Sequence, residues 1–159
     1  MKLLVFSDSH GATATMRTAL SRCRDVDYVI HAGDGSPDLA PLAVGYPVTP
    51  VAVRGNCDFA ADLPLEAELT VEDVRILIVH GHKYGVKGST LTLAHEAYRR
   101  GFDLVIFGHT HERCAKYISA TDSLPPLNLF NPGTARGGDF GVIDIRGREI
   151  LMSHGSIFD

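Results

Sequence analysis

The chain has 159 residues, of which 45% are hydrophobic and 21% are charged, and its formal net charge at pH 7 is −4. This length and composition predict one globular domain over residues 1–159, with enough apolar side chains for a sizeable core. The negative net charge and the scattered Lys and Arg residues exclude a basic surface for polymeric nucleic acid or for an anionic membrane.

The first predicted element is a strand over 3–6, where the apolar run LLVF ends at polar residues. Four apolar residues are too few for a signal peptide or a membrane span, so we expect a cytoplasmic protein. A helix is predicted over 13–23 from the spacing of its apolar residues. The predicted buried face of this helix holds Met16, Ala19, Leu20 and Cys23.

Later apolar runs alternate with a second helical pattern, over 90–100. Further buried strands are predicted where the runs are short and β-branched, at 28–30, 51–53, 76–79 and 104–107. The second helix is expected to have Ser89 as its N-cap, Gly101 at its end, and an apolar face of Leu91, Ala94 and Tyr98. Alternating strands and helices predict an α/β core.

Two hairpin patterns accompany this core. One turns at Glu72-Asp73 and the other at Arg146-Gly147, each between two apolar segments. Strands that meander through 115–130 add further pairing partners. The fold class predicted from these elements is α/β, with a two-sheet β-sandwich flanked by helices.

Polar side chains directly follow each of the five predicted buried strands of the α/β pattern. These side chains are Asp8, His10, Asp34, Asn56, His80, His82, His109 and His111. Each has an ordinary explanation by itself, as a helix cap, a turn residue or a satisfied histidine. However, the carboxyl ends of strands gather at one edge of an open α/β sheet, and the two His-x-His pairs would project to one side of an extended segment. Together the residues predict one polar site.

The donor types in this set indicate which metals the site would bind. Carboxylate, imidazole and carboxamide groups without thiolate suit Mn²⁺, Fe²⁺ or Zn²⁺ rather than Cu(I) or an iron–sulfur cluster. Seven ligands exceed what one ion needs if a position must stay open for substrate. Two ions that share one carboxylate fit the number better.

The same residues form an ordered set of motifs. These are Asp8-Ser9-His10, Gly33-Asp34, Gly55-Asn56-Cys57-Asp58, His80 and Gly108-His109-Thr110-His111. In this order the chain resembles the calcineurin-like metallophosphoesterases, in particular the small phosphodiesterases that lack a cap domain. The later segment Asn131-Pro132-Gly133-Thr134 is also similar to that family. One position departs, because the family has a histidine where this chain has Cys57.

The resemblance implies a metal-binding role for seven residues. It assigns the first metal to Asp8, His10 and His111, the second to Asn56, His80 and His109, and the bridge to Asp34. His80 is preferred to His82 as ligand because the family's ligand precedes the glycine; His82 would then face the substrate, as would Asn56. The expected cofactor is a pair of divalent ions, Mn²⁺ first, with Fe²⁺, Ni²⁺ or Zn²⁺ as alternatives.

The function that the resemblance implies is that of a metal-dependent phosphoric diester hydrolase. Metal-bound hydroxide would attack a small or activated phosphodiester, with the seven ligands as the catalytic set. A second hypothesis is a protein-binding scaffold, because the fold also resembles a trafficking-complex subunit with a vestigial metal site. The complete ligand set favours the enzyme. The physiological substrate stays open, as does the choice between a monomer and a homo-oligomer.

Cys57 has several conceivable roles, as a metal ligand, a nucleophile, a core residue or a replacement for the family's histidine. The three cysteines lack a Cys-x-x-Cys spacing, which argues against a disulfide framework and a structural zinc site. In the resembling family the histidine at this position helps to protonate the leaving oxygen. A thiol is a weak donor, so this chain is expected to prefer diesters with good leaving groups.

Overall fold

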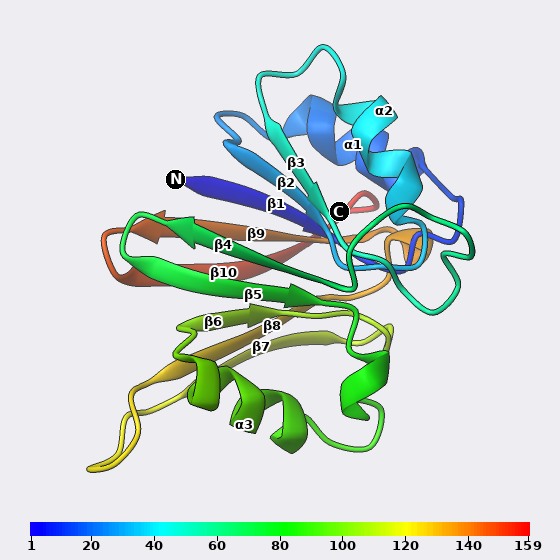
Figure 1. Cartoon of the computed structure of the whole chain (residues 1–159). Coiled ribbons are helices and arrows are strands. Elements are labelled where there is room, and N and C mark those ends of the chain that lie inside the picture. The colour runs from blue at the N-terminus through cyan, green and yellow to red at the C-terminus, as the bar shows by residue number, and fades with distance from the viewer.

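The first sheet of the computed structural model, which describes residues 1–159, has the strand order β10-β9-β1-β2-β3 (Figure 1). Its strands are β1 (Lys2–Phe6), β2 (Tyr28–His31), β3 (Thr49–Ala52), β9 (Asp139–Arg146) and β10 (Glu149–Ser156). Helices α1 (Ala14–Arg22) and α2 (Leu39–Ala43) connect β1, β2 and β3, which therefore run parallel. The hairpin of β9 and β10 pairs antiparallel with β1.

The second sheet has the order β4-β5-β6-β8-β7. Its strands are β4 (Glu66–Val71), β5 (Val74–Val79), β6 (Leu104–Ile106), β7 (Arg113–Ile118) and β8 (Leu127–Pro132). Helix α3 (Leu91–Arg100) connects β5 to β6, and these two strands and β8 run parallel. Single-turn 3₁₀ helices lie in the loops, namely η1 (Ser36–Asp38), η2 (His82–Tyr84) and η3 (Ala135–Gly137).

The two sheets pack face to face, and helices cover their outer faces (Figure 1). Strand β1 shows the layering, since its side chains alternate between two separate cores. Leu3 and Val5 pack between the sheets, whereas Leu4 and Phe6 pack in the core that contains α1 and α2. Both faces of β1 are therefore buried, which explains its continuous apolar run. The predicted sandwich flanked by helices is confirmed.

Helix α3 differs in detail from the prediction. It begins after Thr90 rather than Ser89, although the Ser89 hydroxyl accepts a hydrogen bond from the Leu91 N–H at 3.1 Å. Leu91 is 76% exposed, so it does not belong to the buried face. That face holds Leu93, Ala94 and Ala97. Gly101 ends the helix in the left-handed conformation at φ 74°, as predicted.

Two further expectations need correction. The last hairpin turns at Gly147-Arg148, one residue later than predicted, because Arg146 still pairs with Glu149. Helix α2 was not expected from the sequence, since its residues Leu39–Ala43 are too few for a helical period. None of the helices is long and apolar enough to cross a membrane.

Candidate metal centre

The predicted site residues come from both sheets. Asp8, Asp34 and Asn56 follow β1, β2 and β3 of the first sheet, whereas the four histidines His80, His82, His109 and His111 follow β5 and β6 of the second. In Figure 1 the arrowheads of β1, β3 and β5 point to the same side of the molecule. The expectation of one sheet edge is therefore corrected: the strand ends of two packed sheets meet here.

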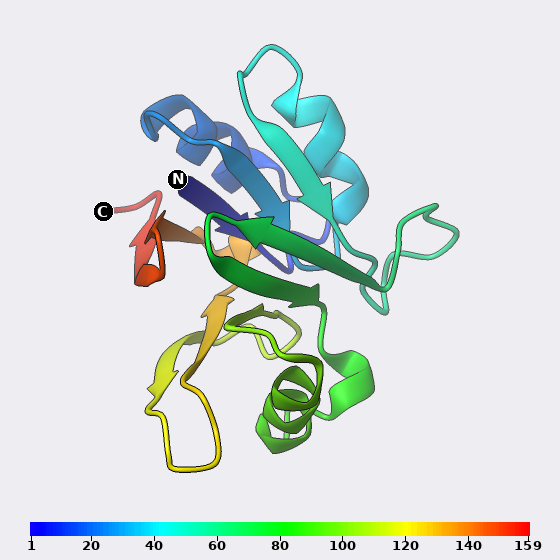
Figure 2. The same cartoon turned by 60° about the vertical axis from the view of Figure 1, so that its left-hand side comes forward.

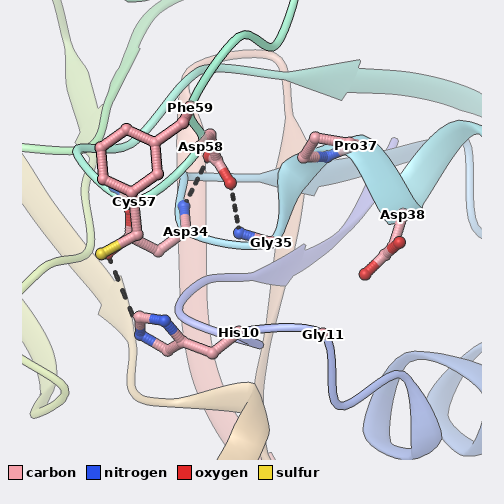
Figure 3. Close-up of a pocket in the computed structure, with 9 residues that line it drawn as sticks. All are labelled: His10, Gly11, Asp34, Gly35, Pro37, Asp38, Cys57, Asp58 and Phe59. Carbon is pink, nitrogen blue, oxygen red and sulfur yellow. Dashed lines mark hydrogen bonds and ion pairs between the residues drawn. The ribbon is translucent and has the colours of Figure 1, made fainter.

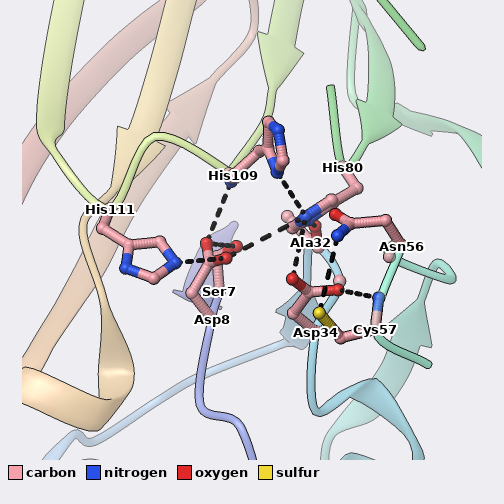
Figure 4. A network of polar contacts seen from close by, with 12 residues as sticks. Ser7, Asp8, Ala32, Asp34, Asn56, Cys57, His80, His109 and His111 are labelled. Atoms are coloured by element: carbon pink, nitrogen blue, oxygen red, sulfur yellow. Dashed lines mark hydrogen bonds and ion pairs between the residues drawn. The ribbon is translucent and has the colours of Figure 1, made fainter. Parts of the chain in front are cut away.

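Asp8 is fully buried at the centre of the cluster. Its Oδ2 accepts hydrogen bonds from the Ser7 hydroxyl and from the backbone N–H of His109. Its Oδ1 accepts no hydrogen bond. Imidazole Nε2 atoms lie near that oxygen, from His111 at 3.2 Å and His80 at 3.9 Å (Figure 4) and from His10 at 3.8 Å.

Asp34 lies between two groups of histidines, with His80 on one side and His10 on the other. Its Oδ1 accepts a hydrogen bond from the Cys57 N–H at 2.8 Å. Its Oδ2 is 3.3 Å from His80 Nε2 and 3.9 Å from His10 Nε2. Burial opposes the charge of Asp34, but the hydrogen bonds from His80 and from the Cys57 N–H outweigh it and lower the pKa of this carboxyl. Asp34 is therefore held as a carboxylate that faces both groups.

His80 is held by the chain in a defined tautomer. Its Nδ1 lies 2.8 Å from the carbonyl oxygen of Ala32, which can only accept, so Nδ1 carries the proton. Its Nε2 faces Asp34 and His109. In the neutral ring Nε2 offers a lone pair to a cation, and in the protonated ring it donates to Asp34. Burial acts to lower the pKa of His80, and the hydrogen bond to Asp34 with the charges of Asp8 and Asp34 raises it overall.

His109 and His111 diverge instead of projecting to one side of a strand. Both have left-handed backbones, at φ 69° and 62°, so the expected extended geometry is wrong for this pair. His109 Nδ1 lies 3.2 Å from His80 Nε2, and burial followed by the charge of His80 lowers the pKa of His109. His111 Nε2 instead lies 3.4 Å from His10 Nε2. His109 therefore lies with His80, and His111 lies with His10.

Three groups of donors can be drawn from the cluster. In each, the ligand atoms lie within 4.8 Å of one another. The groups are Asp8 with His10 and His111, Asp34 with His80 and His109, and His10 with Asp34 and Cys57. The first two correspond to the two sets that the resemblance implies, apart from Asn56. Cys57 enters only the third.

Asn56 and Cys57 stand side by side at the exposed rim. In Figure 4 the Asn56 carboxamide points towards His80 and Asp34, and its Nδ2 lies 3.5 Å from Cys57 Sγ. The Cys57 side chain lies near Asp34. Burial and then the negative charge of Asp34 raise the pKa of this thiol. The surroundings of this thiol therefore favour its protonated form.

His82 lies apart from the donor groups. Gly81 adopts φ 104° and turns the chain, so His82 starts η2 instead of continuing an extended segment. Its ring centroid is 5.4 Å from that of His80 and 6.2 Å from that of His109. Its Nδ1 is buried without a hydrogen-bond partner, and burial lowers the pKa of this histidine.

This geometry separates the expected effects of two substitutions. His80→Ala should remove one metal and lower kcat/KM by more than about 10²-fold, because even outer partners of a ligand contribute about 10–100-fold. His82→Ala should retain the metal content of the wild type and change mainly KM. Elemental analysis and kinetics on both variants provide the measurement. Loss of metal in His82→Ala with retention in His80→Ala would reverse the assignment.

Two glycines allow the loops to approach the carboxylates. A Cβ at Gly55 would collide with Asp34 Oδ1, and one at Gly108 would collide with Ser7 Oγ and lie 2.8 Å from Asp8 Oδ2. Any side chain at these positions would displace the carboxylates. The Gly-Asn and Gly-His motifs therefore have a steric reason for their glycine.

Asp58 and His31 support the site, although no supporting role is predicted for either from the sequence. The buried Asp58 carboxylate accepts backbone N–H bonds from Asp34, Gly35 and Gly55 at 2.7–2.8 Å, and so joins two loops. His31 is fully buried, which lowers its pKa to about 4. Its Nδ1 accepts from the Gly33 N–H, so Nε2 donates to the Ser9 hydroxyl at 2.9 Å. The sequence signal for His31 was a polar residue in an otherwise buried strand, and that for Asp58 was its place in the Gly55-Asn56-Cys57-Asp58 motif.

Asn131, from the segment Asn131-Pro132-Gly133-Thr134, fixes the histidine loop. Its Nδ2 donates to the Gly108 carbonyl at 3.1 Å and to the Thr110 hydroxyl at 3.0 Å. Thr134 donates from its hydroxyl to the Asp8 carbonyl at 2.9 Å. This segment therefore positions residues of the site without contributing a donor to the three groups.

The arrangement fits divalent metal ions. A buried carboxylate oxygen that accepts no hydrogen bond, such as Asp8 Oδ1, is costly unless a cation or donor satisfies it. The imidazole nitrogens around it offer lone pairs when neutral, so they are equally suited to a cation. Mixed carboxylate and imidazole donors match Mn²⁺, Fe²⁺ and Zn²⁺.

Known proteins are similar to this chain in sequence and in fold. A family model for the calcineurin-like phosphoesterase superfamily domain matches residues 1–143. A probable metallophosphoesterase of Bacillus subtilis is 37% identical over 142 residues, which covers 86% of this chain and 76% of that protein. A phosphodiesterase of Methanocaldococcus jannaschii is 26% identical over 172 aligned positions, covering 94% and 96%. Wild-type Vps29 of Entamoeba histolytica, solved with Zn²⁺, shares the fold at TM-score 0.82 and 19% identity, covering 100% and 94%.

Proposed function

The chain belongs to the calcineurin-like phosphoesterase superfamily, and from this premise we propose that it is a metal-dependent phosphodiesterase acting on small or activated diesters. The observation that carries the proposal is the buried Asp8 Oδ1, which accepts no hydrogen bond and faces three imidazole nitrogens. A purely structural carboxylate would be expected to have both oxygens satisfied. The phosphodiesterase name of one relative supports the choice of a diester.

We assign the ligands in two sets that share one carboxylate. The first set is Asp8, His10 and His111, the second is Asn56, His80 and His109, and Asp34 would bridge them. Two divalent ions, with Mn²⁺ as the first choice, would ionise a water near neutral pH and offset the charge of the phosphate. This assignment is supported by the way that Asp34 Oδ2 faces both His10 and His80.

The residues of the chain provide position and charge for this reaction. The Ala32 carbonyl fixes the His80 ring, and the backbone N–H of His109 and the Ser7 hydroxyl fix Asp8. Asn56, at the exposed rim, and His82, whose ring centroid is 5.4 Å from that of His80, would contact the phosphate oxygens. Such fixed groups stabilise developing charge without having to reorganise during the reaction.

Metal dependence is the direct test. Purified protein should contain divalent metal, hydrolyse bis(p-nitrophenyl) phosphate with added Mn²⁺, and lose this activity on chelation. Restored activity after metal is returned would exclude irreversible unfolding. His95→Ala is the control variant and should keep both the metal and the activity, since His95 lies exposed on α3 outside the donor groups. A fully folded, metal-loaded protein that hydrolyses no phosphodiester would contradict the proposal.

A scaffold role is the second candidate. The similarity to Vps29 shows a common fold and carries no information about partners. The retained donors favour the enzyme, because a scaffold would not need a buried carboxylate surrounded by histidines. Metal content together with hydrolysis therefore separates the two functions.

A further inference from the structure

A cavity of about 400 Å³ opens beside the candidate metal centre (Figure 3). His10, Asp34 and Cys57 line one part of it, and Pro37 and Asp38 of η1 line another. Because His10 and Asp34 also belong to the donor groups, the cavity and the metal centre are continuous. A phosphodiester held at the metals would have room to place one ester group here.

Phe59 lines this cavity and is the most exposed large apolar residue of the chain, at 86%. It lies in the loop between β3 and β4, which projects from the sheets in Figure 2. In Figure 3 its ring lies beside Cys57 at the edge of the cavity. An exposed aromatic ring at the mouth of a polar cavity offers a flat face for stacking.

Asp38 adds a free acceptor to the same cavity. In Figure 3 no dashed line reaches the Asp38 carboxylate, and the Asp38 side chain does not cap the following helix. Asp58 also lines the cavity, but its oxygens are occupied by three backbone N–H groups. Asp38 is therefore available to a ligand that brings O–H or N–H donors.

We propose that this cavity, the Phe59 subsite, binds the nucleoside portion of a small phosphodiester. The base stacks on Phe59, and a hydroxyl or N–H of the nucleoside donates to Asp38. A simple alkyl ester would satisfy neither group, and a nitrophenyl ester would lack the donor. The inference rests on the proposed phosphodiesterase function and names its substrate class as nucleoside esters of mononucleotide size.

Binding of two monophosphates to the metal-loaded protein tests this subsite. Adenosine 5′-monophosphate and methyl phosphate share the phosphate group, so the ratio of their dissociation constants by calorimetry isolates the nucleoside. The wild type should bind the adenosine compound about tenfold tighter or more. Phe59→Ala should remove most of this preference and Phe59→Tyr should keep it. Asp38→Ala should weaken only the adenosine compound.

Leu151→Ala is the control, because Leu151 is 67% exposed on β10 and lies outside the cavity. Equal affinity for both monophosphates in the wild type, or an unchanged ratio in Phe59→Ala, would overturn the subsite. Hydrolysis of bis(p-nitrophenyl) phosphate, measured on the same preparations, keeps the two proposals apart. Hydrolysis without a nucleoside preference refutes the subsite alone, whereas absence of hydrolysis refutes the phosphodiesterase function.

Discussion

Asp34→Asn should lower metal occupancy at both positions and reduce kcat/KM by more than about 10³-fold, since the loss of a single outer partner of a metal ligand already costs about 10–100-fold. The carboxamide oxygen can still accept the Cys57 N–H, so the local fold should persist. What is lost is the negative charge of Oδ2, which faces both His80 and His10. Elemental analysis of the purified variant measures the occupancy.

Asn56→Ala is the matched comparison for Asp34→Asn. Asn56 is expected to serve one ion only, so this variant should lose mainly one metal and retain the other. Circular dichroism establishes that both variants are folded. If each variant lost the same single ion, Asp34 would be an ordinary ligand of one metal and the bridging assignment would fail.

Cys57→His should raise hydrolysis of alkyl monoesters by about 10²-fold, within the range of about 10²–10⁴-fold that general acid catalysis contributes. The wild-type thiol is a poor acid here, because burial and the charge of Asp34 raise its pKa and because sulfur is a weak hydrogen-bond donor. An imidazole at this rim position could protonate a departing alkoxide. The measurement is kcat/KM for an alkyl monoester and an aryl diester in both proteins.

Metal content must be measured alongside these rates, since Cys57 Sγ lies within 4.8 Å of donor atoms of His10 and Asp34. Both metals should stay bound in Cys57→His, and Cys57→Ala should still hydrolyse the aryl diester. Two results would show that Cys57 acts chemically itself. One is loss of a metal in Cys57→His, and the other is loss of diester hydrolysis in Cys57→Ala with both metals present.

The fold was predictable where burial leaves a direct trace in the sequence. Strands such as β1 are buried on both faces, so they appear as short apolar runs. The start of α3 was predicted less well because Ser89 and Thr90 are both plausible caps, and the exposed Leu91 fits the helical period by chance. Such details depend on which side chains the rest of the fold covers.

The gathering of the site residues was also predictable, because strand ends carry them to one place. The orientation of each pair of histidines was not, since Gly81 and the left-handed His109 and His111 remove the extended geometry assumed for them. Asp58 could not be recognised as a clamp because its role exists only when two loops meet. A contact between residues far apart in the sequence produces no hydrophobic period and no motif spacing from which it could be predicted.

The backbone at the candidate metal centre has a thermodynamic consequence for the whole chain. Five donors adopt the left-handed conformation, namely Asp8, His10, Asp34, His109 and His111. That conformation costs a residue with a side chain about 1–2 kcal/mol, and the surrounding fold must supply this free energy when no ion is bound. Ions that bind only the folded state would raise the free energy of unfolding in proportion to the logarithm of their free concentration. The melting temperature of this protein would then report the metal supply of its surroundings.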